Sequence, residues 1–315
     1  MNYQYIVQRL LSALVVVLGV TVVVFMIVQI VPGDPARVVL GPYANDEAVA
    51  GLRERLGLNR PIIEQYLSWL EALTRGDFGQ SLLSSQEVAP QLWGRIGPSF
   101  ELALASLLVG LAIAFPVGIL SALKPGSGID IAATIFSQIG VSIPSFWMGI
   151  MLVIIFSLNF SLLPPSGYTP ITEDPADWFA HIILPAFTAG VVSASIMTRF
   201  IRSAMLDVLS ANYVQTARAK GLGERAVVLR HALRNAMITI VTIIGLQINA
   251  LFSGVVIVEV VFSWPGLGRL ALNAVLERDY PLLQGTVLVV AVMFTMVNLL
   301  VDLLYFVLDP RIEYA

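Results

Sequence analysis

Long runs of apolar residues dominate this chain and restrict what it can fold into. The first run, residues 10–28, is almost unbroken and has the ~20 residues that a helix needs to cross a bilayer. A secretory signal peptide has a shorter core of ~7–15 apolar residues and a small-residue cleavage site. The run at residues 10–28 is longer and is followed by Pro-Gly-Asp-Pro, so we predict an uncleaved first membrane span.

The composition favours a membrane protein over a water-soluble one. Apolar residues make up 57% of the 315 residues and charged residues only 12%, with a mean hydropathy of +0.84, which no soluble core requires. We therefore predict an all-α polytopic membrane protein with six transmembrane helices. Pro116, Pro144 and Pro185 interrupt three of them and predict kinks. The six spans are predicted at residues 10–28, 100–123, 131–160, 182–206, 236–262 and 283–308.

The distribution of lysine and arginine predicts the orientation of the spans. The predicted inner face carries Arg9, Lys124, a basic stretch between spans four and five, and Arg311, whereas the short outer loops carry only Arg269 and Arg278. Basic residues close to the ends of spans favour the cytoplasmic side. We therefore predict a multi-pass protein of the cytoplasmic (inner) membrane with both termini in the cytoplasm.

The segment at residues 32–99, between the first two spans, resembles a small helical extracytoplasmic domain. One helix is expected to begin at Asn45 and to end at Gly57, with Ala48, Leu52 and Leu56 on one face. A second is expected to begin at Pro61 and to end at Gly76. Its apolar stripe would consist of Ile62, Ile63, Tyr66, Leu67, Leu70 and Leu73. On its composition, this segment is a helical cap packed on the outer surface of the membrane.

One long polar stretch, residues 207–235, lies between the fourth and fifth spans. Asn212 and Gln215 have the spacing of a capping box, which predicts a helix starting at Tyr213. Gly221 and Gly223 are expected to end it after about two turns in the left-handed conformation. A second helix should then begin at Glu224 and continue into the fifth span. By composition alone, such a basic loop is equally well explained as a cytoplasmic anchor.

Four motifs in the same order along the chain resemble one known family. They are PGDPAR at residues 32–37, GDFGQS at residues 76–81, TARAKGL at residues 216–222 and FSWPGLGRL at residues 262–270. The pattern resembles the inner-membrane permease subunits of ABC importers, in the dipeptide/oligopeptide branch. Gln215, Thr216 and Ala217 stand where the EAA loop of that family has its Glu-Ala-Ala signature, Gly221 is its glycine and Leu233 its later leucine. Two departures are Gln215 in place of glutamate and Arg234 in place of the final proline.

The resemblance implies a permease that moves short peptides by alternating access, driven by separate ATPase subunits. The implied partners are a second homologous permease subunit, two ATP-binding subunits that hold ATP and magnesium, and an extracytoplasmic substrate-binding protein, which residues 32–99 are expected to contact. The branch carries dipeptides, oligopeptides, glutathione and nickel chelates. The short helix is then the coupling helix that contacts the ATPase. Its contact residues would be Tyr213, Gln215, Thr216, Ala217, Arg218, Lys220, Gly221 and Leu222.

Polar residues in and after the fifth span are candidates for the substrate route. Gly245, Asn249 and Ser253 recur every four residues on one face, which indicates either close helix packing or a lining of the route, because polar groups in a bilayer face protein or water. The lining set is Gln247, Asn249, Ser253 and Glu259, with Glu259 attracting a peptide's amino group. In the outer loop, residues 263–281, Trp264 and Tyr280 are expected as interfacial anchors around an amphipathic helix. The resemblance makes Trp264, Arg269 and Asp279 gate or docking residues.

No motif of an enzyme is present in the sequence. There is no G-x-x-x-x-G-K-[ST], no H-E-x-x-H and no G-x-S-x-G, and there are two histidines and no cysteine. GLGERA and GLGRLA fit a loose dinucleotide pattern but lie outside any soluble strand–turn–helix unit. We expect no cofactor or metal on this chain and no enzymatic activity. The alternative function is a self-sufficient secondary transporter or channel, which is disfavoured because no convincing internal repeat is seen.

Overall fold

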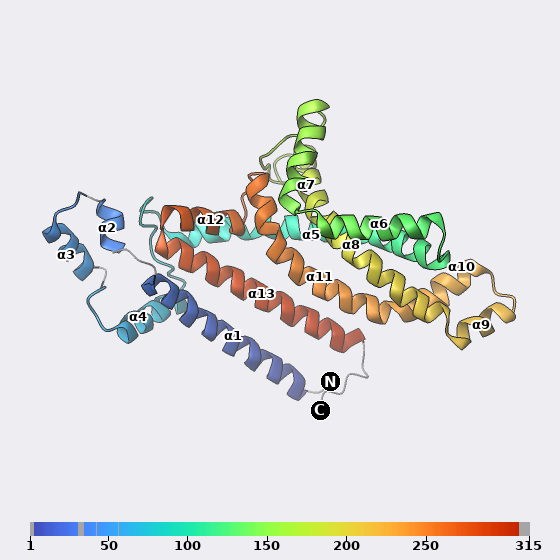
Figure 1. Ribbon diagram of the computed structural model, residues 1–315. Helices are drawn as coiled ribbons and strands as arrows, with labels where there is room; N and C mark the ends of the chain where they lie inside the picture. The colour runs from blue at the N-terminus through green and yellow to red at the C-terminus, as the bar shows by residue number, and fades with distance from the viewer. Residues whose placement is uncertain (1–2, 31–34, 42, 56, 309–315) are drawn as a thin grey trace. The chain divides into compact units, whose positions relative to one another are not determined.

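The computed structural model describes residues 3–30, 35–41, 43–55 and 57–308, and within these ranges the chain is predominantly helical (Figure 1). The only other regular pairing in the described part is an isolated bridge between Gln80 and Glu87. The prediction of an all-α membrane protein is confirmed. Residues 32–34 of the PGDPAR motif, Leu56 and Arg311 lie outside the described residues.

Among the described residues, five helices are long and apolar enough to cross a membrane. They are α1 (Tyr3–Ile30), α5 (Val88–Leu123), α8 (Pro175–Leu209), the stretch Glu224–Val261 that ends in α11 (Leu233–Val261), and α13 (Tyr280–Leu308). The remaining predicted span corresponds to a bent pair, α6 (Gly128–Ser142) followed by α7 (Ser145–Leu152) and the π-helix η1 (Val153–Asn159). The six predicted spans are therefore five continuous helices and one broken one.

The break between α6 and α7 differs from the single kinked span predicted at residues 131–160. The two helices are bent by 103°, and Ile143 between them is extended, with φ −80° and ψ 124°. Proline disfavours the helical conformation of the residue before it and has no N–H to donate, so Pro144 starts a new helix. Pro185 instead lies inside α8, which continues through it. Leu184, Pro185 and Ala186 are all buried by neighbouring helices. Helix α5 likewise continues through Pro116, which is exposed.

The described residues form two compact units. The first comprises residues 1–98 and 266–299, with α2 (Pro35–Leu40), α3 (Asp46–Arg55), α4 (Ile62–Thr74) and α12 (Leu267–Glu277). As predicted, the Asn45 side chain caps α3 by accepting the Ala48 N–H at 2.8 Å. Gly57 and Gly76 have φ values of +67° and +79°. The core of this unit is made by α5, α12 and α13 through Val88, Leu92, Leu267, Leu270, Ala274, Leu282 and Val289.

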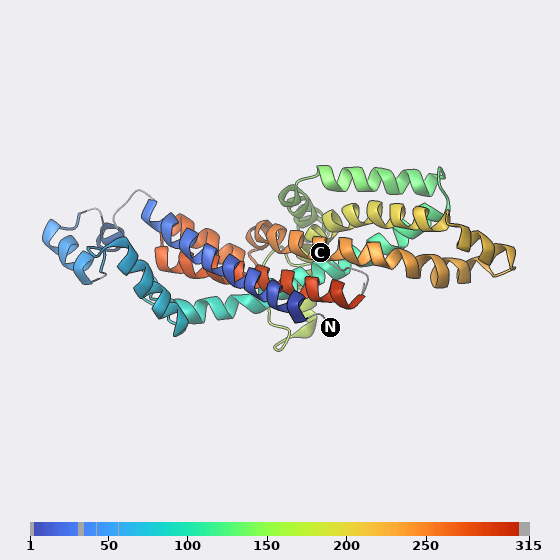
Figure 2. The ribbon, with the colours of Figure 1, turned by 90° about the horizontal axis from the view of Figure 1, so that it is seen from below.

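The second unit, residues 99–265 and 300–315, is built around α8. Its most apolar segment is 61% buried, against 33% or less for the other continuous spans. Helices α6 and α11 pack along α8 (Figure 2). Small residues permit the close approach: a Cβ on Gly190 would lie 2.7 Å from the Ser106 carbonyl oxygen, and one on Gly140 would lie 1.8 Å from Ser195 Oγ.

Candidate functional site

The short helix α9 (Asn212–Ala219) lies between α8 and α10 (Glu224–Ala226) and has the two turns that were predicted. Its inner face is apolar, because Val214 and Ala217 are buried against Val227. The rest of the helix and the loop after it are exposed. Of the eight predicted coupling residues, only Ala217 faces the protein. The exposed ones are Tyr213, Gln215, Thr216, Arg218, Lys220, Gly221 and Leu222.

The predicted capping box at the start of α9 is wrong. Asn212 is the first helical residue, the N-cap is Ala211, and no side chain caps the helix. Gln215 Nε2 instead donates to the Ser210 carbonyl oxygen at 3.4 Å. Only Ser210 and Ala211 separate α8 from α9, so the tight turn between the two helices, rather than a side-chain cap, sets where α9 begins.

Of the two glycines predicted to end α9 in the left-handed conformation, only one does so. Gly221 has φ +79°, and its N–H donates to the Arg218 carbonyl oxygen at 2.9 Å. Gly223 is the extended N-cap of α10, with φ −60° and ψ 141°, so the prediction for Gly223 was wrong. After α10 the chain passes through a π-helix, η2 (Val227–Ala232), into α11.

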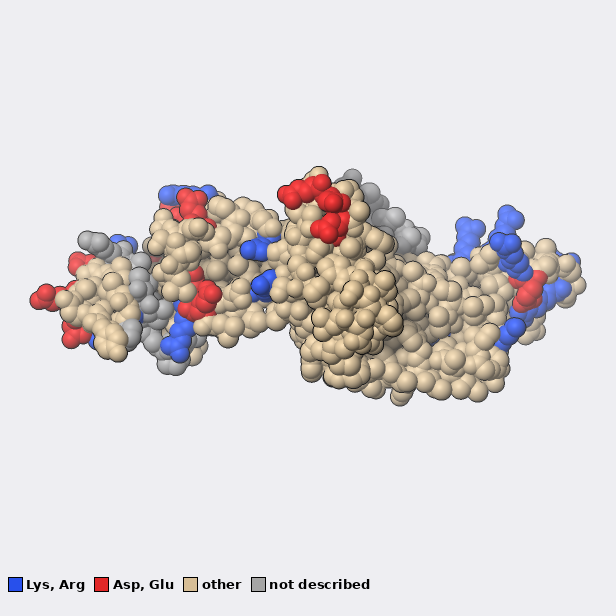
Figure 3. Space-filling view, turned by 90° about the horizontal axis from the view of Figure 1, so that it is seen from above, with Lys and Arg blue, Asp and Glu red and all other residues tan. Residues whose placement is uncertain are grey.

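The loop after α9 is basic and is closed by an exposed ion pair. Arg218 Nη2 lies 2.6 Å from Glu224 Oε1, and this hydrogen bond raises the pKa of the Arg218 guanidinium. Figure 3 shows lysine and arginine side chains gathered over α9 and α10. This end of the second unit therefore presents a small, positively charged, largely preformed surface.

A partly buried ion pair joins three helices about two helical turns before α9. Arg202 of α8 donates to Asp130 of α6, with Nε 2.6 Å from Oδ1 and Nη2 2.8 Å from Oδ2. The Ser121 hydroxyl of α5 and the Gly126 N–H also donate to this carboxylate. Arg202 lies seven residues before the end of α8 at Leu209, about 10 Å along the helix. The sequence analysis did not single out this pair, although Ser127 and Asp130 have the spacing of a helix-capping pair.

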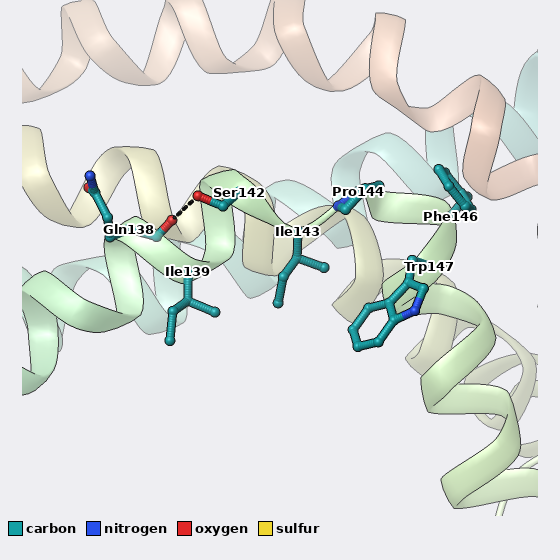
Figure 4. Close-up of a pocket in the computed structure, with 7 residues that line it drawn as sticks. All are labelled: Gln138, Ile139, Ser142, Ile143, Pro144, Phe146 and Trp147. Carbon is teal, nitrogen blue, oxygen red and sulfur yellow. Dashed lines mark hydrogen bonds between the residues drawn. The ribbon is translucent and has the colours of Figure 1, made fainter.

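A concavity of about 510 Å³ opens at the bend between α6 and α7 (Figure 4). Sequence reasoning missed this site, although a proline between the two apolar halves of one span is a known signal of a broken helix. Ser142 Oγ donates to the Gln138 carbonyl oxygen at 2.8 Å, and Phe146 and Trp147 are each about half exposed. The lining residues are Gln138, Ile139, Ser142, Ile143, Pro144, Phe146 and Trp147.

The four predicted lining residues of α11 do not share one environment. Gln247 and Glu259 are buried within the second unit, where Ser193 Oγ donates to Gln247 at 3.3 Å and Ser99 Oγ to Glu259 at 2.6 Å. Ser253 is exposed and Asn249 is half-buried. Among the described residues, the Asn249 Oδ1 atom has no hydrogen-bond partner.

The ends of the outer loop are buried rather than interfacial. Trp264 is fully buried and meets Tyr168 edge to face at 4.7 Å. Burial and the nearby Glu101 carboxylate raise the pKa of Tyr168 to about 12. Tyr280 is also buried, so the prediction of two interfacial anchors was wrong. The reason is that both rings fill space between helices, which sequence spacing does not reveal.

Asp279, a predicted gate or docking residue, joins distant parts of the first unit. It is 1% exposed and accepts the Ser81 hydroxyl of the GDFGQS motif as well as the Leu82 N–H at 3.2 Å. Arg269 of α12 is half-buried. Phe78 of the same motif packs on the cluster that contains Leu267 and Leu270. Two of the four sequence motifs therefore meet in space.

Residues 114–314 match the protein family described as the binding-protein-dependent transport system inner membrane component. Residues 2–100 match the N-terminal part described for the same systems. The chain belongs to this family of ABC transporter permeases.

Curated relatives align with the permease along almost its whole length. A probable peptide ABC transporter permease of Sinorhizobium fredii is 39% identical over 310 residues, covering 98% of this chain and 99% of the relative. The oligopeptide transport system permease AppB of Bacillus subtilis is 39% identical over 313 residues, with the same coverage. The glutathione transport system permease GsiC of Salmonella typhimurium is 41% identical over 310 residues, also with that coverage.

Solved structures share the fold of the permease. An inward-facing structure of the MetNI methionine ABC transporter matches with a TM-score of 0.57 at 15% identity, covering 70% of this chain and 96% of that chain. An amino acid ABC transporter matches with a TM-score of 0.52 at 14% identity, covering 69% and 93%.

These findings establish the class of the protein. It is a multi-pass permease subunit of an ABC importer in the inner membrane, and a transport component rather than an enzyme. Members of this family work with ATPase and substrate-binding components.

Proposed function

We propose that this permease imports short peptides by alternating access, and that α9 is the point at which separate ATPase subunits drive it. The names of its relatives support the substrate class, since they include peptide, oligopeptide, dipeptide and glutathione permeases. The observation that carries the coupling role is that α9 buries one face in this chain and leaves the other free. Seven of the eight coupling residues lie on the free face or in the loop after it.

Movement of α9 reaches the membrane through α8. Two residues connect the helices, and α8 is in turn held to α5 and α6 by the Arg202–Asp130 pair. A displacement of α9 by the ATPase is therefore expected to move α5, α6 and α8 together. Nucleotide on one side and substrate on the other bias one conformational equilibrium, which is the physical meaning of their coupling.

The proposal extends to the assembly and its orientation. The permease pairs with a second homologous permease subunit, with two ATPase subunits that bind ATP and magnesium, and with an extracytoplasmic binding protein. Both termini and α9 lie in the cytoplasm, in line with the basic residues gathered over α9 and α10. In this orientation Trp264, Arg269 and Asp279 belong to the outer end, where they shape the gate by packing.

The bend at Ile143 and Pro144 is the part of the bundle best suited to line the substrate route. Irregular backbone at membrane depth is tolerated only where protein or a water-filled cavity covers it, because lipid offers no hydrogen bonds. Ser142 and Pro144 are nevertheless exposed on this chain. We therefore place this concavity on the substrate route, where this permease meets the second permease subunit. Asn249 and Ser253 belong to the same lining, because their helix α11 packs on α7. Gln247 and Glu259 are buried, so they support the lining residues by packing and do not themselves face the route.

Reconstitution tests the proposed function directly. In proteoliposomes holding the permease with its partner permease, ATPase subunits and binding protein, peptide uptake is expected to require ATP. The permease alone is expected to accumulate no peptide, because it has no site of its own to capture the energy. Robust accumulation by the lone chain, driven by a proton or sodium gradient, would contradict the proposal and favour a secondary transporter.

Thiol labelling tests the proposed route at the bend. The chain contains no cysteine, so Ser142→Cys introduces a single thiol. A membrane-impermeant reagent is expected to modify Ser142→Cys at least about tenfold faster than Val15→Cys, because the reactive thiolate forms in water and not in hydrocarbon. Val15 is the matched control, since it is exposed in the middle of the apolar helix α1. Equal, slow labelling of both variants would remove the bend from the route.

A further inference from the structure

Helix α4 has an apolar face that the protein leaves uncovered. None of its residues is buried, and Ile63 and Leu67, which lie one turn apart on one face, have side chains that are 72% and 55% exposed. Scattered exposed apolar residues are ordinary, but a contiguous patch of them marks an interaction surface. The surface of α4 next to these residues is polar, because Glu64 and Glu71 lie one turn before and one turn after Leu67, and Arg75 forms an exposed ion pair with Glu71.

Helix α4 lies against the carboxyl-terminal turns of the first span within the same compact unit (Figure 1). The Tyr66 and Thr21 hydroxyls are hydrogen-bonded at 2.9 Å. The ring of Phe25 lies 5.4 Å from that of Tyr66 and 5.8 Å from that of Trp69. Side-chain contacts on three successive turns of α1 thus fix the height of α4 along that span; the outermost is Gln29 Nε2 to Gln65 Oε1 at 3.2 Å.

The height of these contacts places α4 at the membrane boundary. The span of α1, Ile6–Ile30, has 25 residues, about 38 Å at 1.5 Å per residue, against a hydrocarbon core of about 30 Å. If the span is centred on the core, Phe25 lies about 4 Å inside its boundary and Thr21 about 10 Å inside. Amphipathic helices that bind membranes bury their apolar faces by about 5–10 Å. The α1 residues that contact α4 therefore lie at the depth to which such helices bury their apolar faces.

Large apolar residues of α1 are also exposed at the level at which α4 is held. Val22, Val23, Met26 and Ile27 are large apolar residues of α1 that are exposed in this part of the span. In a membrane-crossing helix such residues face the acyl chains. A partner protein in water would have to cover Ile63 and Leu67 while leaving the adjacent α1 surface to lipid, whereas the bilayer covers both surfaces at once.

We propose that α4 is an interfacial helix that binds the bilayer in the leaflet at the carboxyl end of α1. Ile63 and Leu67 lie among the acyl chains, and Glu64 and Glu71 lie toward the headgroups and water. The helix thereby anchors residues 45–76 to the lipid surface and fixes the entry of α5. This role lies beyond peptide transport and stands whether or not the transport proposal is correct.

Spin labelling of the full chain in lipid nanodiscs tests this inference. Single cysteines are introduced as Ile63→Cys, Leu67→Cys and Ser68→Cys, with Val15→Cys as the standard for the membrane interior; Ser68 is exposed and lies on a different face of α4 from Ile63 and Leu67. Labels at residues 63 and 67 are expected to collide frequently with oxygen, which concentrates in hydrocarbon, and rarely with a water-soluble nickel chelate. Their oxygen-to-nickel ratio is expected to be several-fold above that at residue 68 and to approach that at residue 15. Size-exclusion elution and intrinsic tryptophan fluorescence verify that each variant is folded.

Two outcomes overturn the proposal. If residues 63 and 67 have the same nickel accessibility as residue 68, α4 lies in water. If both labels are immobilised and shielded from oxygen and nickel alike, a protein surface covers α4. Repeating the measurement with and without the binding protein then distinguishes a docking partner from a second copy of this chain.

Discussion

Replacing Gly221 with valine is expected to uncouple ATP hydrolysis from transport while leaving the permease inserted and folded. The glycine ends α9 at φ +79°, a conformation that costs a residue with a side chain about 1–2 kcal/mol. That cost lowers the population of the observed loop by about 5–30-fold, since 1.4 kcal/mol corresponds to a factor of ten. The measurement is ATP hydrolysis by the complete transporter, with and without substrate-loaded binding protein.

Three further variants isolate the backbone effect. No atom lies within 4 Å of a Cβ built on either Gly221 or Gly223, so neither substitution clashes within this chain. Gly223→Val puts the same side chain in ordinary extended backbone, at φ −60°, and should retain most of the stimulated hydrolysis. Gly221→Asn should fall between wild type and Gly221→Val, since asparagine tolerates the left-handed region, and Gly221→Ala should also lose activity. Unchanged stimulation in Gly221→Val would refute the assignment of α9 as the coupling helix.

Replacing Asp130 with alanine is expected to produce the largest loss of stability among the charged residues of the second unit. It leaves the Arg202 guanidinium without its carboxylate where α5, α6 and α8 meet. Removing one partner of a buried pair is strongly destabilising, and the 30% exposure of the Arg202 side chain reduces this cost through solvent screening. The expected result is a fall of several degrees in the unfolding midpoint, measured by tryptophan fluorescence in detergent.

An exposed ion pair of the same length provides the control. The closest N···O distance is 2.6 Å both in Arg202–Asp130 and in Arg218–Glu224, but the side chains of the second pair are 41% and 57% exposed. Such exposed pairs contribute about 0–1 kcal/mol, so Arg218→Ala should shift the midpoint little. The double variant Asp130→Ala with Arg202→Ala should be less destabilised than the sum of its single variants, because no unpaired charge remains. Similar shifts of the midpoint for Asp130→Ala and Arg218→Ala would show that the Arg202–Asp130 pair stabilises the protein no more than an exposed ion pair does.

Local features of the chain could be predicted from its sequence because their causes are local. The length and apolarity of the six runs predict spans whatever surrounds them, since backbone groups in lipid must be bonded within a helix. The Asn45 cap and the left-handed conformation of Gly221 follow from the properties of single residues. The family could likewise be inferred from four short motifs, and relatives across the whole chain confirm it.

The environments of polar and aromatic side chains depended on contacts between residues far apart in the chain. Glu259 and Gln247 were predicted to line a route, and the structure places both in the packed interior. Trp264 and Tyr280 were predicted at the interface and are also buried. Nothing in the spacing of Asp130 and Arg202, 72 residues apart, indicates that they meet. Such pairings are set by how the helices pack, which periodicity along one helix does not encode.

The two prolines show the division between sequence and tertiary structure most clearly. Both Pro144 and Pro185 remove an N–H from a membrane span and disfavour helix before them, and the sequence alone determines that each weakens its helix. Only the tertiary structure decides the outcome: α8 continues through the buried Pro185 and α5 through the exposed Pro116, whereas Pro144 separates α6 from α7 by a 103° bend. The physical reason is that the backbone groups freed by a proline are satisfied by neighbouring helices, by nearby side chains or by local adjustment of the helix, and the sequence around the proline does not determine where this happens.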